Sequence, residues 1–520
     1  MPLTLAPDKI ARVEALLQGV EGDGPGCAVG VVEDGEIAFA RGYGLASLEH
    51  GVPITPATRF YMASVSKQVA ALAVLLAAET GRLDLRDSIR KTIPELPPYM
   101  EGVTLRHLLT HTGGVRDYFI LGFLSGLSSE HPYSEADVLD IVGRQRALNF
   151  PPGEDAVYSN TGYVLLSMAV ARATGAQLDD FAREMIFAPL GMDASRFQHD
   201  HTAVIPDKAF GYAKRGDRWG VANSMLDVVG DGGLYASLED MLAWAKNLLT
   251  PRVGAAAIAR MQTPETLSSG ASTGYGMGLF ITRHRGLAML EHGGGLAGYR
   301  TQLQVYPSEG FGVVVLCNDA AALPQRIARQ VAEICLADRM APPPARAPAP
   351  AIEAVRTRVG CYRTAEGDVL SLVERDGKLY VEGVALALRP LNADSFAIAG
   401  DPDFTRLTFD AEGSVAVTQG SAAAQRFRRC EPPANSDQDE FLGDFQSAEV
   451  GAGCTVQRSG ETLAVSFARG PPAALRLIDL DFLRAQDLGV SLAYRRDGGG
   501  AVDGFTVTGG RVRGIAYGRV

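Results

Sequence analysis

The chain has 520 residues, a formal net charge of −11 at pH 7 and an apolar content of 46%, which is ordinary for a globular protein. This length predicts several domains. The acidic balance argues against a nucleic-acid partner, which would need a basic face. No apolar run approaches the ~20 residues that span a bilayer, so we expect no membrane partner.

The first residues, MPLTLAPDKIARVEALLQGVEG, lack the basic-then-apolar pattern of a secretory signal. They predict a short arm followed by an amphipathic helix, and we therefore expect a cytoplasmic protein. A signal peptide that had been removed would leave the same pattern. The six cysteines are scattered without a C-x-x-C pair, which indicates buried thiols rather than disulfides. The histidines show no metal-ligand spacing, and we predict neither a metal nor a cofactor.

Residues 1–335 mix helical and strand patterns. The segment GCAVGVVEDGEIAFARGYGLAS predicts a strand, an Asp-Gly turn and a second strand. Strands return late, in YGMGLFIT, LAMLEHGG, TQLQVYPS and FGVVVLCN. Strands at both ends with helices between them predict an α+β domain, in which one antiparallel sheet is flanked by helices and carries a helical insert.

The composition changes after residue 335. Residues 336–351 are rich in Pro and Ala, which predicts a linker. Short alternating strands with Gly and Asp turns follow, as in VLSLVERDGKLYVEGVALAL and ETLAVSFARG, and EPPANSDQDE marks a second break. We predict two small antiparallel β-barrel domains, at 352–432 and 438–520, each closed enough to hide its edges.

Ser64 and Lys67 stand at the start of a long apolar helix. Residues i and i+3 share a helix face, so the two side chains should adjoin. Free N–H groups and the positive end of the helix dipole favour an oxyanion at this position. Desolvation by the apolar helix neighbours should lower the lysine pKa and make Lys67 a usable base. The pair alone is weak evidence, because such short patterns recur by chance.

Ser272 is a rival nucleophile, because GASTG at 270–274 matches G-x-S-x-G. A nucleophile elbow needs a strand before the serine and a helix after it. Here a loop precedes the motif and a strand follows it. We therefore reject Ser272 as the nucleophile.

Two further motifs follow in chain order. The segment VYSN places Tyr158 and Asn160 after the turn-rich FPPGEDA, where a phenol and an amide can point in one direction. The segment EHGGGLAG places His292 at the end of a strand, and glycines there let a substrate backbone approach. Alone, the first motif is usually a surface turn and the second a hairpin turn. All three motifs in this order are much harder to obtain by accident.

With these motifs the chain resembles the serine β-lactamase and penicillin-binding superfamily. There a Ser-x-x-Lys helix, a Tyr-x-Asn loop and a Lys- or His-x-Gly strand meet in one cleft. Tyr-x-Asn with the histidine resembles the class C-like branch, peptidase S12. The resemblance covers about residues 10–335 and includes LRHLLTHTGGVRDY and GDGGLYASLEDMLAWAK. Within this branch the chain is similar to the bacterial D-aminopeptidase family, which shares SVSKQ, His-Gly-Gly and two C-terminal β-barrel domains.

The resemblance implies a β-lactamase-like catalytic domain at 1–335 with Ser64 as nucleophile. Lys67 and Tyr158 would handle its proton, in a division of labour that the resemblance leaves open. Asn160 would orient Lys67 or the substrate amide. His292 would stand where relatives place a cationic or hydrogen-bonding lysine.

The same resemblance implies a substrate-binding strand and a loop from the last domain. Gly294 and Gly295 would lie along the substrate, and the backbone N–H groups of Ser64 and Gly295 would form the oxyanion hole. A loop of the last barrel would bring an aspartate to the substrate ammonium group, and RAQDLG at 484–489 places Asp487 there. Asp481 is a second candidate. This loop is shorter than the family's and lacks its prolines, and Phe280 stands where the family has a polar residue.

The family implies a cytoplasmic homodimer that releases N-terminal D-residues from small peptides, amides and esters through an acyl-enzyme. The shortened loop favours an alternative, an esterase, β-lactamase or D,D-carboxypeptidase-like hydrolase. A third hypothesis is a non-catalytic binding protein of the same fold. The intact set of motif residues argues against it, because drift would usually remove one of them.

Overall fold

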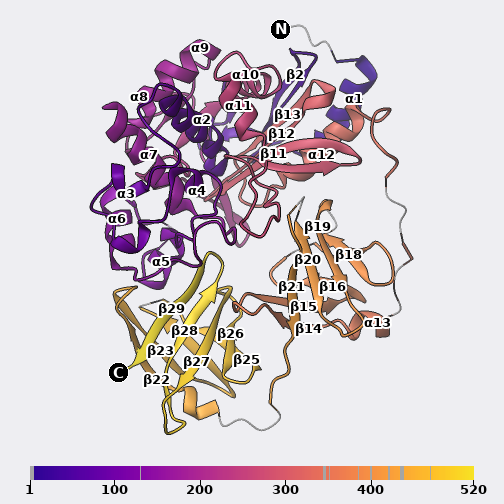
Figure 1. The fold of residues 1–520 in the computed structure, drawn as a ribbon. Coiled ribbons are helices and arrows are strands. Elements are labelled where there is room, and N and C mark those ends of the chain that lie inside the picture. The colour runs from indigo at the N-terminus through magenta and orange to yellow at the C-terminus, as the bar shows by residue number, and fades with distance from the viewer. Residues whose placement is uncertain are drawn as a thin grey trace.

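The structure, a computed structural model, describes residues 5–520 except 21, 129, 344–346, 349, 351, 385, 399–400, 420–421, 434–437 and 469, and only the backbone of 401–404. The prediction of a mixed α/β domain followed by two small antiparallel β-domains is confirmed (Figure 1). No helix in this described part is long and apolar enough to cross a membrane. The six cysteines all lie in it, and each is buried and outside any disulfide.

A six-stranded antiparallel sheet lies at the centre of the first domain, in the order β10-β11-β12-β13-β1-β2. Because β1 pairs with β13, the two ends of the domain close one sheet, as the sequence predicts. The strands are β1 (Cys27–Glu33), β2 (Glu36–Tyr43), β10 (Phe280–His284), β11 (Leu287–Leu296), β12 (Tyr299–Tyr306) and β13 (Phe311–Cys317).

Helices cover both faces of this sheet. Val29 and Val31 of β1 belong to the core under α1 (Pro7–Leu17) and α12 (Pro324–Cys335). Ala28 and Val32 belong to the core of the opposite face, where α10 (Leu238–Leu249) contacts β1 and β13. Successive strand residues face opposite sides, so burial of both faces explains why β1 is an almost continuous apolar run.

The helical insert lies between β2 and β10 and carries the predicted apolar helix, α2. This helix packs against α7 and is buried along nearly its whole length, which explains why it is apolar on every side. The insert's helices are α2 (Ser66–Glu79), α3 (Ile89–Thr92), α4 (Leu105–Leu109), α5 (Tyr118–Leu124), α6 (Glu135–Arg144), α7 (Asn160–Thr174), α8 (Leu178–Ala182), α9 (Ala188–Leu190) and α11 (Ala255–Met261). Its short strands are β3 (Leu45–Ser47), β4 (Val52–Pro53), β5 (Arg59–Tyr61), β6 (Arg196–Phe197), β7 (Tyr212–Arg215), β8 (Arg218–Val221) and β9 (Leu234–Ser237).

Two eight-stranded sheets follow the first domain. The first begins after a short helix, α13 (Ile352–Arg356), and runs in the order β16-β15-β14-β21-β20-β19-β18-β17 around its own apolar core. It comprises β14 (Gly360–Arg363), β15 (Val369–Arg375), β16 (Lys378–Val381), β17 (Leu388–Pro390), β18 (Ser395–Ile398), β19 (Asp401–Phe409), β20 (Val415–Gln419) and β21 (Gln425–Arg429).

The second sheet is a closed barrel, which leaves no open strand edge. It comprises β22 (Gly443–Ser447), β23 (Ala452–Ser459), β24 (Thr462–Phe467), β25 (Ala473–Asp479), β26 (Phe482–Ala485), β27 (Val490–Arg496), β28 (Val502–Gly509) and β29 (Val512–Arg519). In Figure 1 this barrel lies beneath α5 and α6 of the insert, while the first eight-stranded sheet lies beneath β11 and α12. Strand β10 contacts β19 of that sheet.

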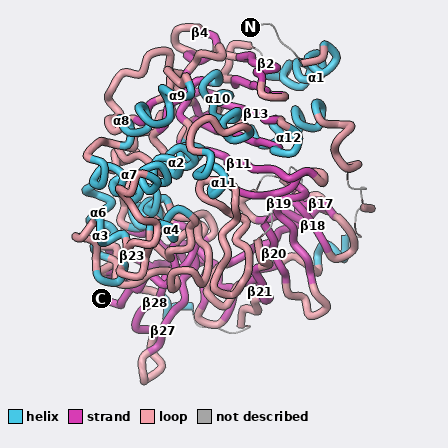
Figure 2. Tube along the Cα trace, turned by 45° about the horizontal axis from the view of Figure 1, so that its top comes forward, coloured by secondary structure: helices cyan, strands magenta, loops and turns pink. Residues whose placement is uncertain are grey.

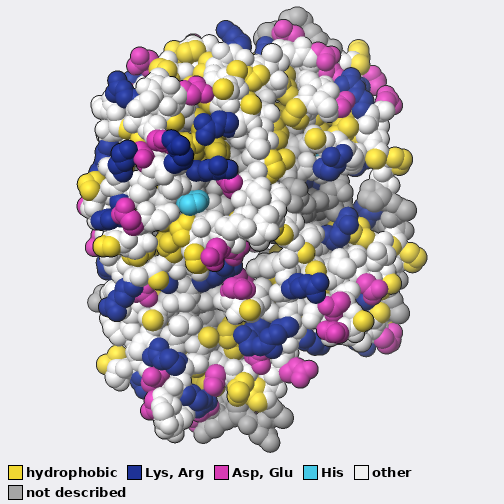
Figure 3. Space-filling view, viewed as in Figure 1, with side chains coloured by type: hydrophobic (Ala, Val, Ile, Leu, Met, Phe, Trp, Pro, Cys, Tyr) yellow, Lys and Arg dark blue, Asp and Glu magenta, His cyan; other side chains and the backbone are white. Residues whose placement is uncertain are grey.

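The three parts lie against one another. In Figure 2 most helices lie along the left and the top of the molecule, with strands of both C-terminal sheets below them. Arg116 of the insert forms a buried ion pair with Glu449 of the barrel, at 2.6 Å. Arg363 joins the two C-terminal sheets through Asp479, at 2.9 Å. On the face shown in Figure 3, positive and negative side chains are interspersed rather than gathered by sign.

Candidate active site

Ser64 lies in a 3₁₀ turn, Ala63–Val65, that leads directly into α2. Ala63 adopts φ +47°, a left-handed conformation that is uncommon for a residue with a side chain. Such local strain persists only where the surroundings enforce it. Gly294 of β11 packs against this turn, since an added Cβ there would stand 2.2 Å from the Met62 carbonyl oxygen. Ser64 itself is half-buried, so its hydroxyl can be reached from outside.

Lys67 is fully buried one turn into the helix, and three oxygen atoms surround its amine. Its Nζ atom lies 3.1 Å from Ser64 Oγ, 2.9 Å from Asn160 Oδ1 and 2.7 Å from the Asp231 carbonyl oxygen. Burial, opposed by the Asp231 carboxylate and assisted by the nearby Arg511, lowers the pKa of Lys67 to about 7. The amine is therefore deprotonated in a large fraction of molecules near neutral pH.

This surrounding suits a neutral amine. A neutral lysine has two N–H donors and one lone pair. The amide oxygen of Asn160 and the carbonyl oxygen of Asp231 can only accept, so they take the two donors. In the structure Nζ donates to Ser64 Oγ, and once the amine has lost a proton its lone pair can accept the Ser64 hydroxyl proton across the same 3.1 Å contact. The geometry is that of a general base beside a nucleophile.

Tyr158 lies in the loop that precedes α7, beside the lysine. The Lys67 amine stands 4.8 Å from the centre of the Tyr158 ring, and the phenol oxygen is buried. Burial raises the pKa of Tyr158, while the nearby Ser64 hydroxyl and Arg511 lower it less. The hydroxyl therefore stays protonated at physiological pH and can donate a hydrogen bond. This environment disfavours a phenolate at Tyr158.

His292 is neutral in the structure rather than cationic. Its Nδ1 atom donates to the Gly293 carbonyl oxygen at 2.7 Å, and its Nε2 atom accepts from the Tyr275 hydroxyl at 3.2 Å. Burial lowers the pKa of His292 to about 3, and the nearby Lys67 acts in the same direction. Of the two predicted possibilities, a cation or a hydrogen-bonding group, this environment supports only the second.

Beyond Glu291, strand β11 pairs with β12 but not with β10 in the described part of the chain. Gly293–Gly295 therefore present a free strand edge, to which an extended substrate can add backbone hydrogen bonds. Gly294 must be glycine, because a Cβ would also lie 2.3 Å from Thr301 Oγ1. Gly295 is roomier, with the nearest atom 3.5 Å from an added Cβ.

Two buried acidic residues near Lys67 carried no role in the sequence analysis. Asp231 lies in GDGG, where Gly230 and Gly233 adopt positive φ values, and its carboxylate accepts from the Tyr118 hydroxyl at 3.1 Å. Asp117 lies in RDY and accepts from the Asn160 N–H at 2.8 Å, which places the Tyr-x-Asn loop. Asp117 and Asp231 both lie in sequence segments on which the family resemblance depends. That resemblance could have identified the two residues as candidates.

His111 and Tyr275 were likewise missed. The His111 ring stacks on Tyr158 with centroids 4.2 Å apart, and the Tyr275 ring lies 4.8 Å from His111. His111 accepts from the Ser159 N–H at 3.2 Å, so it supports the Tyr158 loop from behind. Phe280, at the position where a polar residue was expected, packs against the Tyr275 and His292 rings.

Asp487 lies in the turn between β26 and β27, where it is exposed. In the described residues it makes no hydrogen bond or ion pair with Ser64, Lys67 or Tyr158, so its assignment to ammonium recognition stays a prediction. Asp481, the second candidate, pairs with Arg496 of its own barrel at 2.6 Å. A different residue of this barrel lies against the site, the cation Arg511. Its Cζ atom stands 4.6 Å from the centre of the Tyr158 ring.

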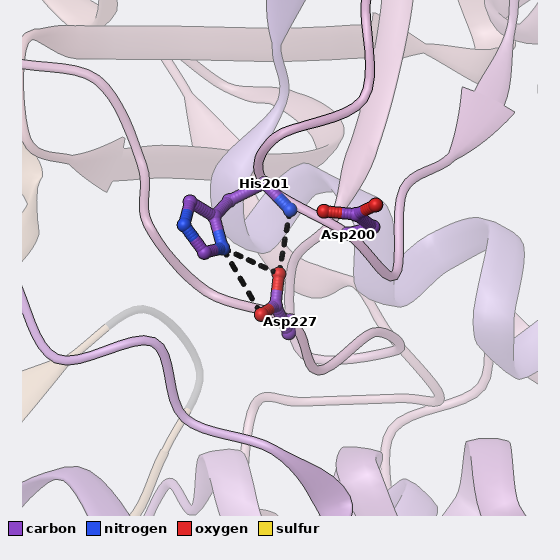
Figure 4. A group of neighbouring side chains, drawn as sticks. All are labelled: Asp200, His201 and Asp227. Atoms are coloured by element: carbon purple, nitrogen blue, oxygen red, sulfur yellow. Dashed lines mark hydrogen bonds and ion pairs between the residues drawn. The ribbon is translucent and has the colours of Figure 1, made fainter.

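Asp200, His201 and Asp227 form a group of possible metal ligands in the described residues (Figure 4). His201 Nδ1 already faces both oxygens of Asp227 at 3.0 Å, and Asp200 accepts from Thr202. His201 Nδ1 is therefore engaged with the Asp227 carboxylate, and the three residues are exposed or half-buried.

Known proteins match both the sequence and the fold. The chain is 32% identical over 318 residues to a D-aminopeptidase from Gluconobacter oxydans, covering 60% of this chain and 59% of that protein. It is 31% identical over 297 residues to a D-aminopeptidase from Brucella anthropi, covering 57% and 56%. The matches thus span less than three fifths of these relatives' length.

Solved structures share the fold. The octameric penicillin-binding protein homologue from Pyrococcus abyssi matches with a TM-score of 0.58 and 23% identity, over 81% of this chain and 100% of that one. SurE with D-Leu matches over 99% of both chains, with a TM-score of 0.51 and 23% identity. At this identity the likeness establishes the fold alone.

The family itself follows from the first domain. A family model described as Beta-lactamase matches residues 11–336, more than half of the chain and the part that carries Ser64, Lys67 and His292. The protein therefore belongs to the Beta-lactamase family.

Proposed function

We propose that this protein is a serine hydrolase that forms an acyl-enzyme on Ser64 and releases N-terminal D-amino acids from short peptides, amides and esters. The observation that carries the chemistry is the buried Lys67 amine, 3.1 Å from Ser64 Oγ in surroundings that suit its neutral form. The preference for D-residues is supported by relatives named D-aminopeptidase.

In the acylation step, Lys67 Nζ accepts the Ser64 proton while Oγ bonds to the substrate carbonyl carbon. The oxygen that becomes negative accepts hydrogen bonds from the backbone N–H groups of Ser64 and Gly295. Each such donor is typically worth about 3 kcal/mol of transition-state stabilisation. The free edge of β11 holds the substrate backbone beside Ser64.

In the collapse step, the carbon–nitrogen bond breaks and the leaving amine takes up a proton. Tyr158 accepts a proton from Lys67 as it donates its own to that amine, so no phenolate accumulates. Water then attacks the ester carbon and loses its proton to Lys67. The Ser64 oxygen regains a proton as the D-amino acid leaves. His292 stays neutral throughout and positions Tyr275 and the β11 turn.

The proposal is tested with D-Ala-p-nitroanilide and its L-enantiomer. We expect the wild type to release nitroaniline from the D-form at a rate at least about tenfold higher, while Ser64→Ala abolishes release. Mass spectrometry of the quenched wild type should show an added acyl group that Ser64→Ala lacks. Equal release by the wild type and Ser64→Ala would refute the proposal. Equal rates with the D- and L-substrates would refute its stereochemical part.

A second candidate function is hydrolysis of other acyl donors, by an esterase, β-lactamase or D,D-carboxypeptidase-like enzyme. The exposed position of Asp487 favours it, because an aminopeptidase needs an acid beside the substrate ammonium group. A substrate panel with a cephalosporin, an acyl ester and an N-acyl D-dipeptide distinguishes this candidate from the first. Failure of Ser64 to react with a serine-directed activity probe would support a non-catalytic binding protein instead.

The homodimer and the cytoplasmic location implied by the family resemblance are part of the same proposal. Light scattering at several protein concentrations tests the dimer, which should have twice the monomer mass.

A further inference from the structure

The tip of the β28–β29 hairpin reaches the active site from the last domain. Gly510 adopts φ +63° at this turn and lies next to the Ile120 side chain of α5. The next residue, Arg511, places its guanidinium over the ring of Tyr158, with 4.6 Å between Cζ and the ring centre. The C-terminal barrel therefore contributes a cation beside the group that would protonate the leaving amine.

The hairpin is held on the loop that carries Tyr158. Asn149 donates to the Arg511 carbonyl oxygen at 3.0 Å and accepts from the Arg513 N–H at 2.7 Å. Arg513 forms an ion pair with Asp155 at 2.7 Å, three residues before Tyr158. Arg116 donates to the Arg513 carbonyl oxygen at 2.9 Å. Four contacts thus fix the backbone around Arg511 relative to Tyr158.

Arg511 retains most of its hydrogen-bonding capacity. Within the described residues its one hydrogen bond is from Nη1 to Asp117 Oδ2, at a long 3.5 Å. Asp117 does not depend on it, because its carboxylate already accepts from the N–H groups of Phe119, Ile120 and Asn160. The Arg511 side chain is 39% exposed, and the 3.5 Å contact with the buried Asp117 carboxylate is its one ion pair among the described residues.

The distribution of charge around the site also favours the binding of an anion at Arg511. His292 is buried and neutral, so the strand side of the site supplies no positive charge. In the described part of the chain, Arg511 is the one cation among the charged groups that act on Lys67. A planar guanidinium with free N–H groups matches a carboxylate, which it can bind through two parallel hydrogen bonds.

We propose that Arg511 binds the free carboxylate of the residue that leaves, so that the enzyme prefers dipeptides whose C-terminal carboxylate adjoins the scissile bond. This inference rests on the proposed function. The hydroxyl of Tyr158 would protonate the leaving nitrogen, and in an α-amino acid a single carbon atom separates that nitrogen from the carboxylate. A guanidinium stacked on the Tyr158 ring is therefore on the side of the site where this carboxylate emerges.

The test compares D-Ala-L-Ala with D-Ala-L-Ala amide, which differ in the carboxylate. We expect the wild type to have a kcat/KM at least about tenfold higher for the free acid, the effect of a charge-assisted hydrogen bond. Arg511→Gln should remove that preference, and Arg511→Lys should restore part of it. D-Ala-p-nitroanilide, which has no carboxylate, serves as the reference substrate for any effect of Arg511 on Lys67 and Tyr158: the ratio of the D-Ala-L-Ala rate to the anilide rate should fall at least about tenfold in Arg511→Gln.

Arg495→Gln is the matched control, because Arg495 lies exposed on the same barrel and pairs with Asp503. It should keep the wild-type ratio of the two dipeptide rates. A wild type that cleaves acid and amide equally would overturn the inference, as would an Arg511→Gln variant that retains the preference. If neither dipeptide nor the anilide is cleaved in a Ser64-dependent manner, the proposed function itself fails. If only the carboxylate preference is missing, that function stands without this inference.

Discussion

Lys67 donates a 2.7 Å hydrogen bond to the backbone carbonyl oxygen of Asp231, and the buried carboxylate of the same residue acts on the lysine charge. The two residues are 164 positions apart in the chain. One residue therefore both orients the amine toward Ser64 and opposes the desolvation that makes it neutral. The balance between these effects determines the pH at which the base becomes active.

The first prediction concerns pH. Lys67 can accept a proton only when deprotonated, and burial lowers its pKa to about 7, so kcat/KM should rise with pH through about 7. Removing the Asp231 charge removes an influence that raises this pKa, so Asp231→Asn should move the rise to lower pH. Arg511→Gln should move it to higher pH, since Arg511 lowers the same pKa. Shifts in the same direction, measured as kcat/KM profiles, would contradict this assignment of the base.

The second prediction concerns the lysine itself. Lys67→Arg places a permanent cation beside Ser64, because an arginine side chain does not lose its proton in proteins. General-base assistance would be lost, which typically lowers the rate by a factor of about 10²–10⁴. Single-turnover kinetics should show slow acylation with little change in substrate binding. Acylation within a few-fold of the wild-type rate would show that another group removes the Ser64 proton.

The third prediction separates Tyr158 from Lys67. Tyr158→Phe keeps the ring on which His111 and Arg511 stack but removes the hydroxyl. The loss should be about 10²-fold for amide substrates, whose leaving nitrogen needs a proton. It should be much smaller for a p-nitrophenyl ester, whose leaving group departs as an anion. Equal losses on amide and ester would place the hydroxyl in another step.

The fourth prediction concerns the packing of β11 against the nucleophile turn. In Gly294→Ala the new Cβ would stand 2.2 Å from the Met62 carbonyl oxygen and 2.3 Å from Thr301 Oγ1. Backbone must move to admit it, and we expect a loss of about 3 kcal/mol in the free energy of unfolding. Gly295→Ala is the control for stability, because its nearest contact would be 3.5 Å. Thermal denaturation of both variants provides the measurement, and similar melting temperatures would contradict the prediction.

The sequence was sufficient for the first sheet and for the nucleophile pair. The apolar runs of β1 and β13 predict buried strands. Ser64 and Lys67 adjoin because the 3₁₀ turn that holds Ser64 leads directly into α2, so this pair required no tertiary information. It was less informative about charge. His292 was compatible with a cation or a neutral donor, and only the buried hydrogen bonds to Gly293 and Tyr275 distinguish them.

The family resemblance led us to expect that the last barrel reaches the site through the turn at 484–489, which carries Asp487, and this stays a prediction. The sequence did not indicate that the neighbouring β28–β29 hairpin brings Arg511 to Tyr158. The two turns lie side by side, since a Cβ on Gly509 would stand 2.4 Å from the Gly489 carbonyl oxygen. Which of two adjacent turns touches another domain depends on how the barrel is rotated when it docks, and no local pattern encodes that rotation.

By itself, then, the sequence determined what arises from neighbours along the chain: the strands, the apolar helix and the Ser64–Lys67 pair. The tertiary structure decided the partners that arrive from far away, namely Asp231 beside Lys67 and Arg511 beside Tyr158. The physical reason is that hydrogen bonding and periodicity within a helix or strand are local, whereas burial, and with it the charge of an ionisable group, depends on every segment packed around it.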